Sequence, residues 1–292
     1  MKKIIALLMA GMMTASVFAG CGAAETGSSG SSTDSSGSTD SSSETSDTAD
    51  WDYIKNKGKM TIGITYFEPM NYKDDNGELT GFETEFATAV CAELGVTPEF
   101  QEINWDSREL ELNANTIDCI WNGMTITDER KENMDISVPY MENKQVMVCR
   151  AEDVEKYSTA DGLDGANVVA EAGSAGEDVA KGNEYFSKAK YASVSAQSTA
   201  LFEVKSGTSD IAVIDYVMSI GTLAEGTDFS DLKVVEAQSF EPEQYGIAFR
   251  KNSPETLKNV NAAIQKLADN GKLKEIADKY NLGDLILVKP AA

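Results

Sequence analysis

The stretch of residues 117–130, IDCIWNGMTITDER, passes from an apolar run to a polar turn. Its apolar beginning predicts a short strand at 117–121, followed by a polar turn marked by a glycine, and Asp128 begins a helix. Arg130 then falls in the first turn of that helix, where the positive end of the helix dipole disfavours a cation. Either Arg130 pairs with a neighbouring acid such as Asp128 or Glu132, or it serves as a receptor for an anion.

Strand and helix patterns alternate on both sides of this stretch. Upstream, they predict strands at 59–65 and 99–103 and helices at 82–94 and 106–113. Downstream, a helix at 128–133 is followed by strands at 145–149, 167–170, 192–194, 211–214, 232–235 and 245–250, and by helices at 176–181, 198–205, 216–223, 254–271 and 273–280. Such alternation argues for βα units in a mostly parallel sheet.

The pattern divides the folded part into two α/β lobes. We expect a discontinuous lobe 1 made of 51–143 and 242–292, and a lobe 2 made of 144–241. The chain would then cross between the lobes twice, near 142–146 and near 238–245, and two crossings make a hinge.

The first 50 residues predict an exported protein. Residues 1–20 have the lysines, apolar core and small residues of a signal peptide. The run Phe18-Ala19-Gly20-Cys21 resembles a bacterial lipobox, in which Cys21 becomes the lipidated first residue; an ordinary signal peptide with an incidental cysteine is the alternative. The segment 21–50 is a Ser, Gly and Asp-rich flexible linker.

Composition excludes several classes of function. The chain has 25 basic and 48 acidic residues and a net charge of −23, which repels nucleic acid. It has no histidine, which removes histidine-based acid–base and nucleophilic catalysis and histidine-containing zinc sites. Neither a metal nor another cofactor is implied. Cys91, Cys119 and Cys149 read best as buried free thiols, although their spacing leaves a bridged pair open.

Polar residues at strand ends form a candidate ligand site, because ligands of open parallel sheets bind beyond the carboxyl ends of the strands. Gly123 and Thr125 can offer backbone N–H groups and a hydroxyl beside the Arg130 guanidinium, which together make an anion receptor. Asp215 ends the apolar strand 211–214 and can receive an ammonium group, although an Asp there is commonly a helix N-cap. Ser174 lies at the start of a predicted helix and can add a second anion contact.

Several ordered segments of 51–292 carry a family resemblance. They are KMTIGIT, NGELTGFETEFATAV, INWD, IDCIWNGMTITDERKENMDIS, SGTSDIAVID and YGIAFRKNSPE. In these segments the chain resembles the extracellular solute-binding proteins (family 3) of polar amino acid ABC transporters. The resemblance implies the type II periplasmic-binding-protein fold, with a ligand cleft between two α/β lobes.

The resemblance also implies roles for individual residues. Arg130 would hold the α-carboxylate of an amino acid, with help from Thr125 and Ser174. Asp215 would hold the α-ammonium group together with the backbone at Gly123.

Other positions of the resemblance concern the ligand side chain. Trp105 would pack on the ligand, with Phe67 or Tyr66 as the second aromatic wall; the alternative is that these aromatics are simple core residues, which suits Tyr66 better. The first loop, ITYFEPM, departs from the family because it is one residue short and has Thr65 where many relatives have an Asp. Trp121-Asn122 replaces small residues.

Acidic and amide side chains near the expected cleft give opposite indications about the ligand. Glu171 and Glu68 favour a cationic or polar amino acid. Asn122 and Gln197 could equally read an amide, so the sequence does not name the amino acid.

The resemblance implies a lipid-anchored, monomeric receptor on the extracytoplasmic face of the cell membrane. It would capture a free amino acid and deliver it to the permease subunits of an ABC importer, without catalysing a reaction. Two alternatives remain. One is an amino-acid-sensing receptor subunit, which would need a signalling partner because no transmembrane or kinase segment follows the domain. The other is a dehydratase on the same fold, with Glu171 as its acid and arogenate or prephenate as its substrate.

Overall fold

The computed structural model describes residues 49–291. The predicted signal peptide, Cys21 and nearly all of the predicted linker lie outside these residues. Helix α1 (Ala49–Lys57) begins within the range assigned to the linker. The Asp50 carboxylate accepts a hydrogen bond of 2.8 Å from the Thr256 amide, in the first turn of α8 (Pro254–Asp269). The folded part of the chain therefore includes the last residues assigned to the linker.

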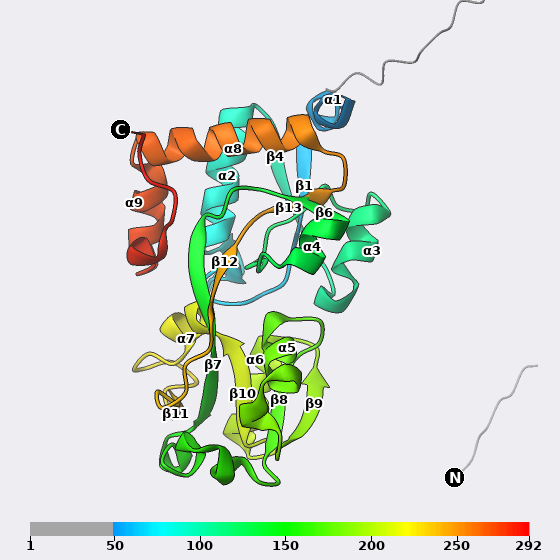
Figure 1. Cartoon of the computed structure of the whole chain (residues 1–292). Helices are drawn as coiled ribbons and strands as arrows, with labels where there is room; N and C mark the ends of the chain where they lie inside the picture. The colour runs from blue at the N-terminus through cyan, green and yellow to red at the C-terminus, as the bar shows by residue number, and fades with distance from the viewer. Residues whose placement is uncertain (1–48, 292) are drawn as a thin grey trace, which may run out of the picture. The chain divides into compact units, whose positions relative to one another are not determined.

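Besides a two-stranded sheet of β2 (Tyr72–Lys73) and β3 (Leu79–Thr80), two larger sheets organise the described residues (Figure 1). One is a five-stranded sheet in the order β4-β1-β5-β13-β6, and it forms lobe 1, the upper part of Figure 1. The other is six-stranded, with the order β11-β7-β10-β8-β9 and with β12 paired to β7 outside this order, and it forms lobe 2. The two-lobe arrangement follows the alternation of strands and helices along the sequence.

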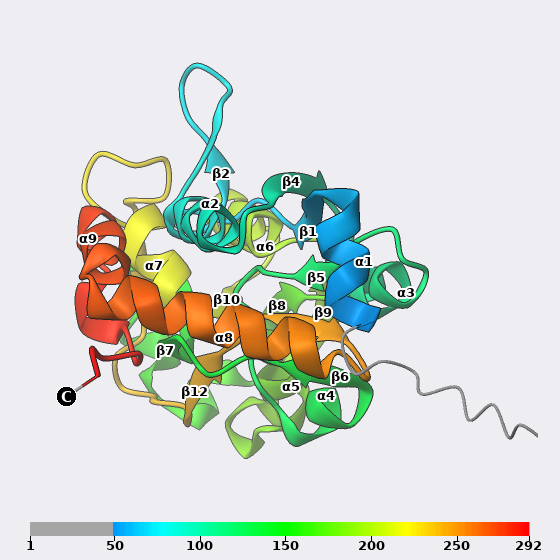
Figure 2. The ribbon, with the colours of Figure 1, turned by 90° about the horizontal axis from the view of Figure 1, so that it is seen from above.

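The elements of lobe 1 come from both ends of the described range. Its strands are β1 (Lys59–Ile64), β2 (Tyr72–Lys73), β3 (Leu79–Thr80), β4 (Thr97–Glu102), β5 (Cys119–Ile120), β6 (Met134–Ile136) and β13 (Ala248–Arg250). Its helices are α1, α2 (Phe82–Leu94), α3 (Arg108–Asn113), α4 (Asp128–Asn133), α8 and α9 (Lys272–Lys279), with 3-10 turns η1 (Trp105–Ser107) and η6 (Gly283–Leu285). Seen from above in Figure 2, α8 lies across this lobe.

The elements of lobe 2 are continuous in sequence. Its strands are β7 (Met141–Arg150), β8 (Asn167–Glu171), β9 (Lys190–Val194), β10 (Ile211–Asp215) and β11 (Leu232–Val234). Its helices are α5 (Ala175–Gly182), α6 (Gln197–Ser206) and α7 (Tyr216–Thr222), with 3-10 turns η2 (Ala151–Asp153), η3 (Lys156–Ser158), η4 (Ala160–Leu163) and η5 (Glu184–Phe186).

Both sheets are mixed. Strand β1 pairs in parallel with β4 and β5, and β8 pairs in parallel with β9 and β10, as expected for βα units. Strands β7 and β13 pair with their neighbours in the antiparallel direction. The predicted parallel character is therefore confirmed for the βα units, and the antiparallel strands are those on either side of the passages between the lobes.

Two strands link the lobes. Strand β12 (Pro242–Tyr245) pairs antiparallel with the first part of β7, with Tyr245 opposite Met141 and Glu243 opposite Asn143. Figure 1 shows β7 and β12 running together from one lobe to the other. The predicted strand at 245–250 is divided, because β12 ends at Tyr245 and β13 begins at Ala248.

The core follows the two-residue period of the strands. On β10, Ala212 and Ile214 belong to a large cluster that extends from lobe 1 into lobe 2. Ile211 and Val213 point to the opposite face, where a second cluster lies between the sheet and the 3-10 segments of lobe 2. Strands buried on both faces explain why 211–214 is a continuous apolar run.

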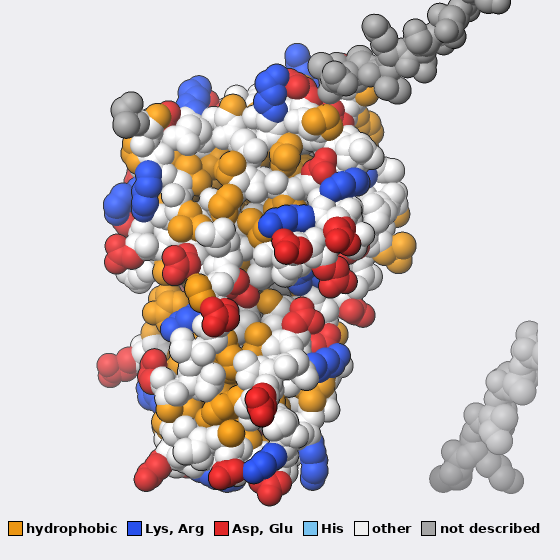
Figure 3. Space-filling view, viewed as in Figure 1, with side chains coloured by type: hydrophobic (Ala, Val, Ile, Leu, Met, Phe, Trp, Pro, Cys, Tyr) orange, Lys and Arg blue, Asp and Glu red, His pale blue; other side chains and the backbone are white. Residues whose placement is uncertain are grey.

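Three further features concern the cysteines, the helix lengths and the surface charge of the described residues. Cys91, Cys119 and Cys149 are buried and free, which confirms the thiol prediction. No helix within residues 49–291 has the length and apolarity needed to span a membrane. Figure 3 shows acidic side chains on both sides of the waist between the lobes, in keeping with the strongly negative charge.

Candidate functional site

All the predicted ligand-binding residues except Phe67 line one enclosed pocket between the lobes. The pocket is lined by Trp105, Asn122, Gly123, Thr125, Arg130, Glu171, Ser174, Ala175, Gln197 and Asp215. Lobe 1 supplies the first five and lobe 2 supplies the rest. The residues come from the ends of strands and from the starts of helices, which is where ligands bind in open α/β sheets.

Arg130 is a buried cation without an ion pair. Only 5% of it is exposed, and burial lowers the pKa of its guanidinium. Its Nη1 donates to the Thr125 carbonyl at 2.7 Å, and its Nη2 donates across the pocket to the Gly173 carbonyl at 3.3 Å. No described carboxylate lies within 4 Å of it, and Asp128 pairs with Lys131 instead. The solvated ion pair considered from the sequence is therefore not formed.

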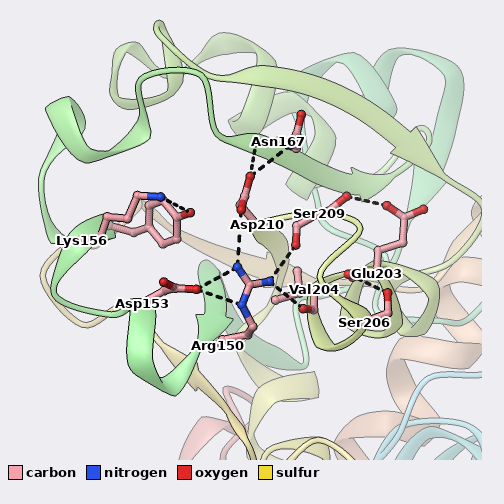
Figure 4. Close-up of polar contacts among 10 residues, drawn as sticks. Arg150, Asp153, Lys156, Asn167, Glu203, Val204, Ser206, Ser209 and Asp210 are labelled. Atoms are coloured by element: carbon pink, nitrogen blue, oxygen red, sulfur yellow. Dashed lines mark hydrogen bonds and ion pairs between the residues drawn. The ribbon is translucent and has the colours of Figure 1, made fainter.

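Arg150 shows what a structural arginine looks like in the same chain (Figure 4). Its guanidinium forms ion pairs with Asp153 at 2.8 Å and Asp210 at 3.5 Å. It also donates to the carbonyls of Val204 and Ser209. Arg150 is satisfied by acids of the fold, whereas Arg130 has only neutral carbonyls as partners.

Two further groups beside Arg130 suit an anion. No described group accepts a hydrogen bond from the Thr125 amide. Ser174 is the N-cap of α5, and its Oγ accepts from the Glu177 amide at 3.1 Å, so its hydroxyl hydrogen is still available. Ala175, in the first turn of α5, also lines the pocket at the positive end of the helix.

Asp215 provides the opposite charge. It is 6% exposed and occupies the N-cap position of α7, but its side chain makes no capping bond. Its Oδ1 accepts from Asn143 and Gln145, each at 2.7 Å, and its Oδ2 accepts from Gln197. Burial raises the pKa of Asp215, and these amide donors oppose the rise. No described cation lies within ion-pair distance of it.

A second carboxylate, that of Glu243 on β12, adjoins Asp215. Its Oε1 accepts from the Thr125 hydroxyl at 3.1 Å, and from the same two amides that serve Asp215, Asn143 at 2.6 Å and Gln145 at 2.9 Å. Burial, and then the charge of Asp215, raise the pKa of Glu243 to about 7. Local sequence patterns do not single out Glu243, Asn143 or Gln145 as site residues; the one signal they carry is that they are polar residues near a predicted passage between the lobes.

Glu171 is the second acid that lines the pocket, after Asp215. It is 4% exposed, and its Oε1 has no hydrogen-bond partner among the described residues. Burial raises the pKa of Glu171 to about 8, the Asp215 charge adds to the rise, and Arg108 opposes it. A buried carboxylate without a partner is costly unless it is protonated or meets a cation.

Trp105 forms a wall of the pocket on the lobe 1 side. Its indole Nε1 is buried without a partner, so it can donate to a ligand. Arg108, which no sequence pattern marks as a site residue, has its guanidinium carbon 4.7 Å from the Trp105 ring centroid and donates to the Trp105 carbonyl at 2.8 Å. The stacked guanidinium holds the ring in place.

The side-chain amides of Asn122 and Gln197, which could recognise a ligand amide, already form hydrogen bonds within the protein. The Asn122 Oδ1 accepts from the Thr65 amide and from Asn71, and its Nδ2 donates to the Thr65 hydroxyl at 2.7 Å. Gln197 donates to Asp215 and accepts from the Asp215 amide at 2.9 Å. Both amides therefore stabilise the pocket walls, and of the acid and amide side chains that line the pocket, Glu171 keeps an oxygen without a hydrogen-bond partner.

Gly123 requires a correction. Its amide, expected to bind an anion, donates to the buried Glu83 Oε1 at 2.8 Å and is not available. No described donor reaches the Gly123 carbonyl, so this oxygen remains free for an ammonium group. Gly123 has φ +55°, and a Cβ here would meet the Phe67 ring at 2.8 Å. Phe67 thus packs behind Gly123, while Tyr66 lines a different groove.

The pocket has the equipment to bind a zwitterion. For a carboxylate, the pocket offers the Arg130 guanidinium, the Thr125 amide and the Ser174 hydroxyl. For an ammonium group, it offers the Asp215 carboxylate and the Gly123 carbonyl. Within residues 49–291, no group of His, Cys, Asp and Glu side chains is arranged to hold a metal ion.

Comparison with known proteins agrees with this geometry. Residues 60–283 match the family described as bacterial extracellular solute-binding proteins, family 3. The chain is similar to the L-cystine-binding protein of Escherichia coli K12, with 27% identity over 228 residues, 78% of this chain and 84% of that protein. It is also similar to the L-arginine-binding protein of Pseudomonas aeruginosa, with 31% identity over 225 residues, 75% of this chain and 86% of that protein.

Solved structures give the same result. An ABC uptake transporter substrate-binding protein from Streptococcus pneumoniae, with bound histidine, matches with a TM-score of 0.75 and 32% identity. The match covers 81% of this chain and 98% of that chain. The expected fold, two α/β lobes of the type II arrangement, is thereby confirmed.

Proposed function

Because the chain belongs to the bacterial extracellular solute-binding proteins of family 3, we propose that it captures a free amino acid between its lobes and delivers it to the permease of an ABC importer. One observation carries the proposal. Arg130 and Asp215, two buried and opposite charges without ion-pair partners among residues 49–291, line the same enclosed pocket. An amino acid brings a carboxylate and an ammonium group that satisfy both.

The proposed ligand contacts come from both lobes, and this would make the two lobes close around the ligand. Arg130, Thr125 and the Gly123 carbonyl belong to lobe 1, and Ser174 and Asp215 belong to lobe 2. A ligand that bonds to both lobes stabilises the closed form over the open form. We assign the hinge to β7 and β12, the two strands that link the lobes.

Hydrogen bonds to the charged groups of this site are strong enough to account for micromolar binding of an amino acid. Hydrogen bonds to charged groups contribute about 1.5–3 kcal/mol each. A few of them at Arg130 and Asp215 reach the approximately −8 kcal/mol of a micromolar complex. Closure adds the exclusion of water, which strengthens each contact.

A cationic or polar side chain suits the remainder of the pocket. Asn122 and Gln197 are bonded within the protein, whereas the Glu171 Oε1 has no partner. A cationic ligand group would hold Glu171 in its ionised form, and a neutral donor would hydrogen-bond to it. Glu68, the other acid named from the sequence, is exposed and does not line the pocket.

The family places the protein outside the cytoplasm. We propose that a lipid on Cys21 anchors it to the membrane and that the linker 22–48 lets a monomer reach the permease. A radiolabelled palmitate that is incorporated into the wild-type chain, but not into a Cys21→Ala variant, would support the anchor. Equal incorporation into both would contradict it.

We propose that binding involves no chemistry. The dehydratase alternative has one candidate acid in the pocket, Glu171, whose raised pKa suits proton donation. Turnover of arogenate or prephenate by the purified chain would establish this alternative, and its absence alongside amino-acid binding would support a receptor.

The proposal is tested by screening the common amino acids and cystine for a rise in melting temperature of the purified domain, 49–292. Calorimetry on the hits then gives the affinity. Because a ligand that binds only the folded state adds about 2.7 kcal/mol at one hundred times its Kd, a true ligand should raise Tm clearly. No shift with any free amino acid would overturn the proposal.

A further inference from the structure

The carboxylates of Asp215 and Glu243 share their hydrogen-bond donors. The Asn143 Nδ2 lies 2.7 Å from the Asp215 Oδ1 and 2.6 Å from the Glu243 Oε1. The Gln145 Nε2 lies 2.7 Å and 2.9 Å from the same two oxygens. Strand register fixes this arrangement, because Asn143 is opposite Glu243 and Gln145 is opposite Asp215. Two amide groups therefore hold two carboxylates together at the linking strands.

A buried carboxylate, Asp215, and a half-buried one, Glu243, do not both ionise readily when they share donors. The charges that act on the pair come from several elements: Arg130 on α4, Glu83 on α2 and Glu171 on β8. Arg130 is the single cation among these, and it is not within ion-pair distance of either carboxylate. The phenols of Tyr140 and Tyr245 are buried nearby and neutral, since burial raises the pKa of both. The Tyr245 hydroxyl, like the amide donors, opposes the rise in the pKa of Asp215, but burial is the larger effect. The surroundings thus favour one proton on the pair.

Glu243 also has a route to water. It lines a second, more open groove with Ile126, Lys131, Glu142, Pro242 and Gln244. Asp215 lines the ligand pocket instead. The pair therefore joins the enclosed pocket to a solvent-facing groove on the linking strands, where Lys131 and Glu142 are the other charged groups.

We propose that Asp215 and Glu243 share one proton in the ligand-free protein, and that the ammonium group of the bound amino acid displaces this proton to solvent. Glu243 is then a positioning residue that acts through Asp215 and makes capture proton-coupled. The exchange balances, because the pair goes from one negative charge to two, the ammonium adds one positive charge, and one proton leaves by the groove. This inference rests on the proposed function and deepens it.

The test is calorimetry with whichever of L-arginine, L-histidine and L-glutamine raises Tm most, in phosphate and in Tris near pH 7. The difference in heat between the two buffers counts released protons. We expect the wild-type chain to release a proton and its affinity to rise with pH between about 5.5 and 7, approaching tenfold per pH unit, the limit for one linked proton. No release by the wild type would overturn the inference without any variant.

Variants locate the proton. Glu243→Gln should still bind, but with less proton release and with an affinity that changes less than about twofold per pH unit. Glu243→Asp should restore the slope. Glu142→Gln removes an exposed acid of the same groove and should behave as the wild type. Glu171→Gln, measured separately, subtracts any proton that Glu171 releases.

The outcomes separate the two proposals. Wild-type proton release and pH slope retained in Glu243→Gln would overturn the role of Glu243 while leaving amino-acid capture intact. Absence of binding to every amino acid tested would overturn the proposed function and this inference together. Circular dichroism of each variant checks that the fold is kept.

Discussion

A buried guanidinium without a carboxylate beside it is an expensive feature for a fold to keep. Removing one partner of a buried ion pair typically costs about 3–5 kcal/mol, because the other charge is left uncompensated. Arg130 occupies such a position with only main-chain carbonyls as acceptors, whereas Arg150 has two acids. On the proposed function, a ligand carboxylate would supply the missing charge, so the stabilisation would be gained on binding.

At the same scale, Glu171→Gln tests the choice of ligand side chain. If Glu171 meets a cationic group, removing its charge should weaken the binding of L-arginine by roughly 10- to 100-fold, since a charged hydrogen bond contributes about 1.5–3 kcal/mol. L-glutamine should change much less. Calorimetry with both ligands decides, and an equal loss for both would show that Glu171 does not face the side chain.

Residues of the site differed in how far the sequence could predict them. Asp215 and Arg130 stand out locally, because Asp215 ends an apolar strand and Arg130 is a cation in the first turn of a helix, where the helix dipole disfavours it. Glu243 could not be found in this way, because its contact with Asn143 joins positions 100 residues apart in the chain. That contact depends on the register of β7 and β12, which local patterns do not specify.

At the scale of an element, the N-cap of α4 positions Arg130. The Thr127 Oγ1 accepts a hydrogen bond from the Arg130 amide at 3.1 Å, which satisfies a free donor of the first turn. Thr127→Ala should cost about 1 kcal/mol of unfolding free energy, and should also weaken ligand binding because α4 frays where Arg130 is attached.

Urea unfolding and calorimetry measure the two effects of Thr127→Ala. Thr127→Ser keeps the hydroxyl and is the matched control. Equal stability and affinity of the alanine and serine variants would show that the cap does not hold Arg130.

Most elements were predictable, and the exceptions have physical reasons. The helix at 128–133 is confirmed residue for residue. Helix α1 was missed as a helix because Ile54 is its one buried residue, so it has no apolar stripe. The strand predicted at 117–121 is paired only over Cys119–Ile120. The strand predicted at 245–250 is broken at Gly246, where a Cβ would meet the Ile136 side chain at 2.5 Å.

At the scale of the whole molecule, several buried acids make stability depend on pH. Burial raises the pKa of Glu83 to about 7, against opposing hydrogen bonds from Tyr140 and Gly123. The folded state therefore holds this proton more tightly than the unfolded chain, whose Glu titrates near 4.5. The resulting stability is full below that value and is lost as the pH rises through about 7.

We therefore expect the ligand-free protein to lose stability between about pH 5 and pH 8. Glu83→Gln cannot ionise and should reduce this loss by an amount on the order of 2 kcal/mol. Urea midpoints across the range measure it, with Glu78→Gln, an exposed acid of the same lobe, as the control. A slope unchanged by Glu83→Gln would show that Glu83 ionises freely in the folded protein.

Arg130 belongs to lobe 1 and Asp215 to lobe 2, so the two charges line one pocket only when the lobes lie against each other. The two strands that link the lobes, β7 and β12, pair over Met141–Lys144 and Pro242–Tyr245; the crossings near 142–146 and 238–245 stay a prediction from the sequence. The sequence could not show how far the lobes enclose the pocket, since that depends on contacts such as the one between Arg130 and the Gly173 carbonyl. Ligand capture is thus a property of the closed molecule.

The most direct test is calorimetry of Arg130→Ala beside Lys131→Ala, which removes the neighbouring exposed cation that pairs with Asp128. The Arg130 variant should keep its circular dichroism spectrum and lose at least about 100-fold in amino-acid affinity, because the carboxylate loses its buried partner. The Lys131 variant should bind as the wild type does. Near-native affinity in Arg130→Ala would contradict the assignment of this pocket as the amino-acid site.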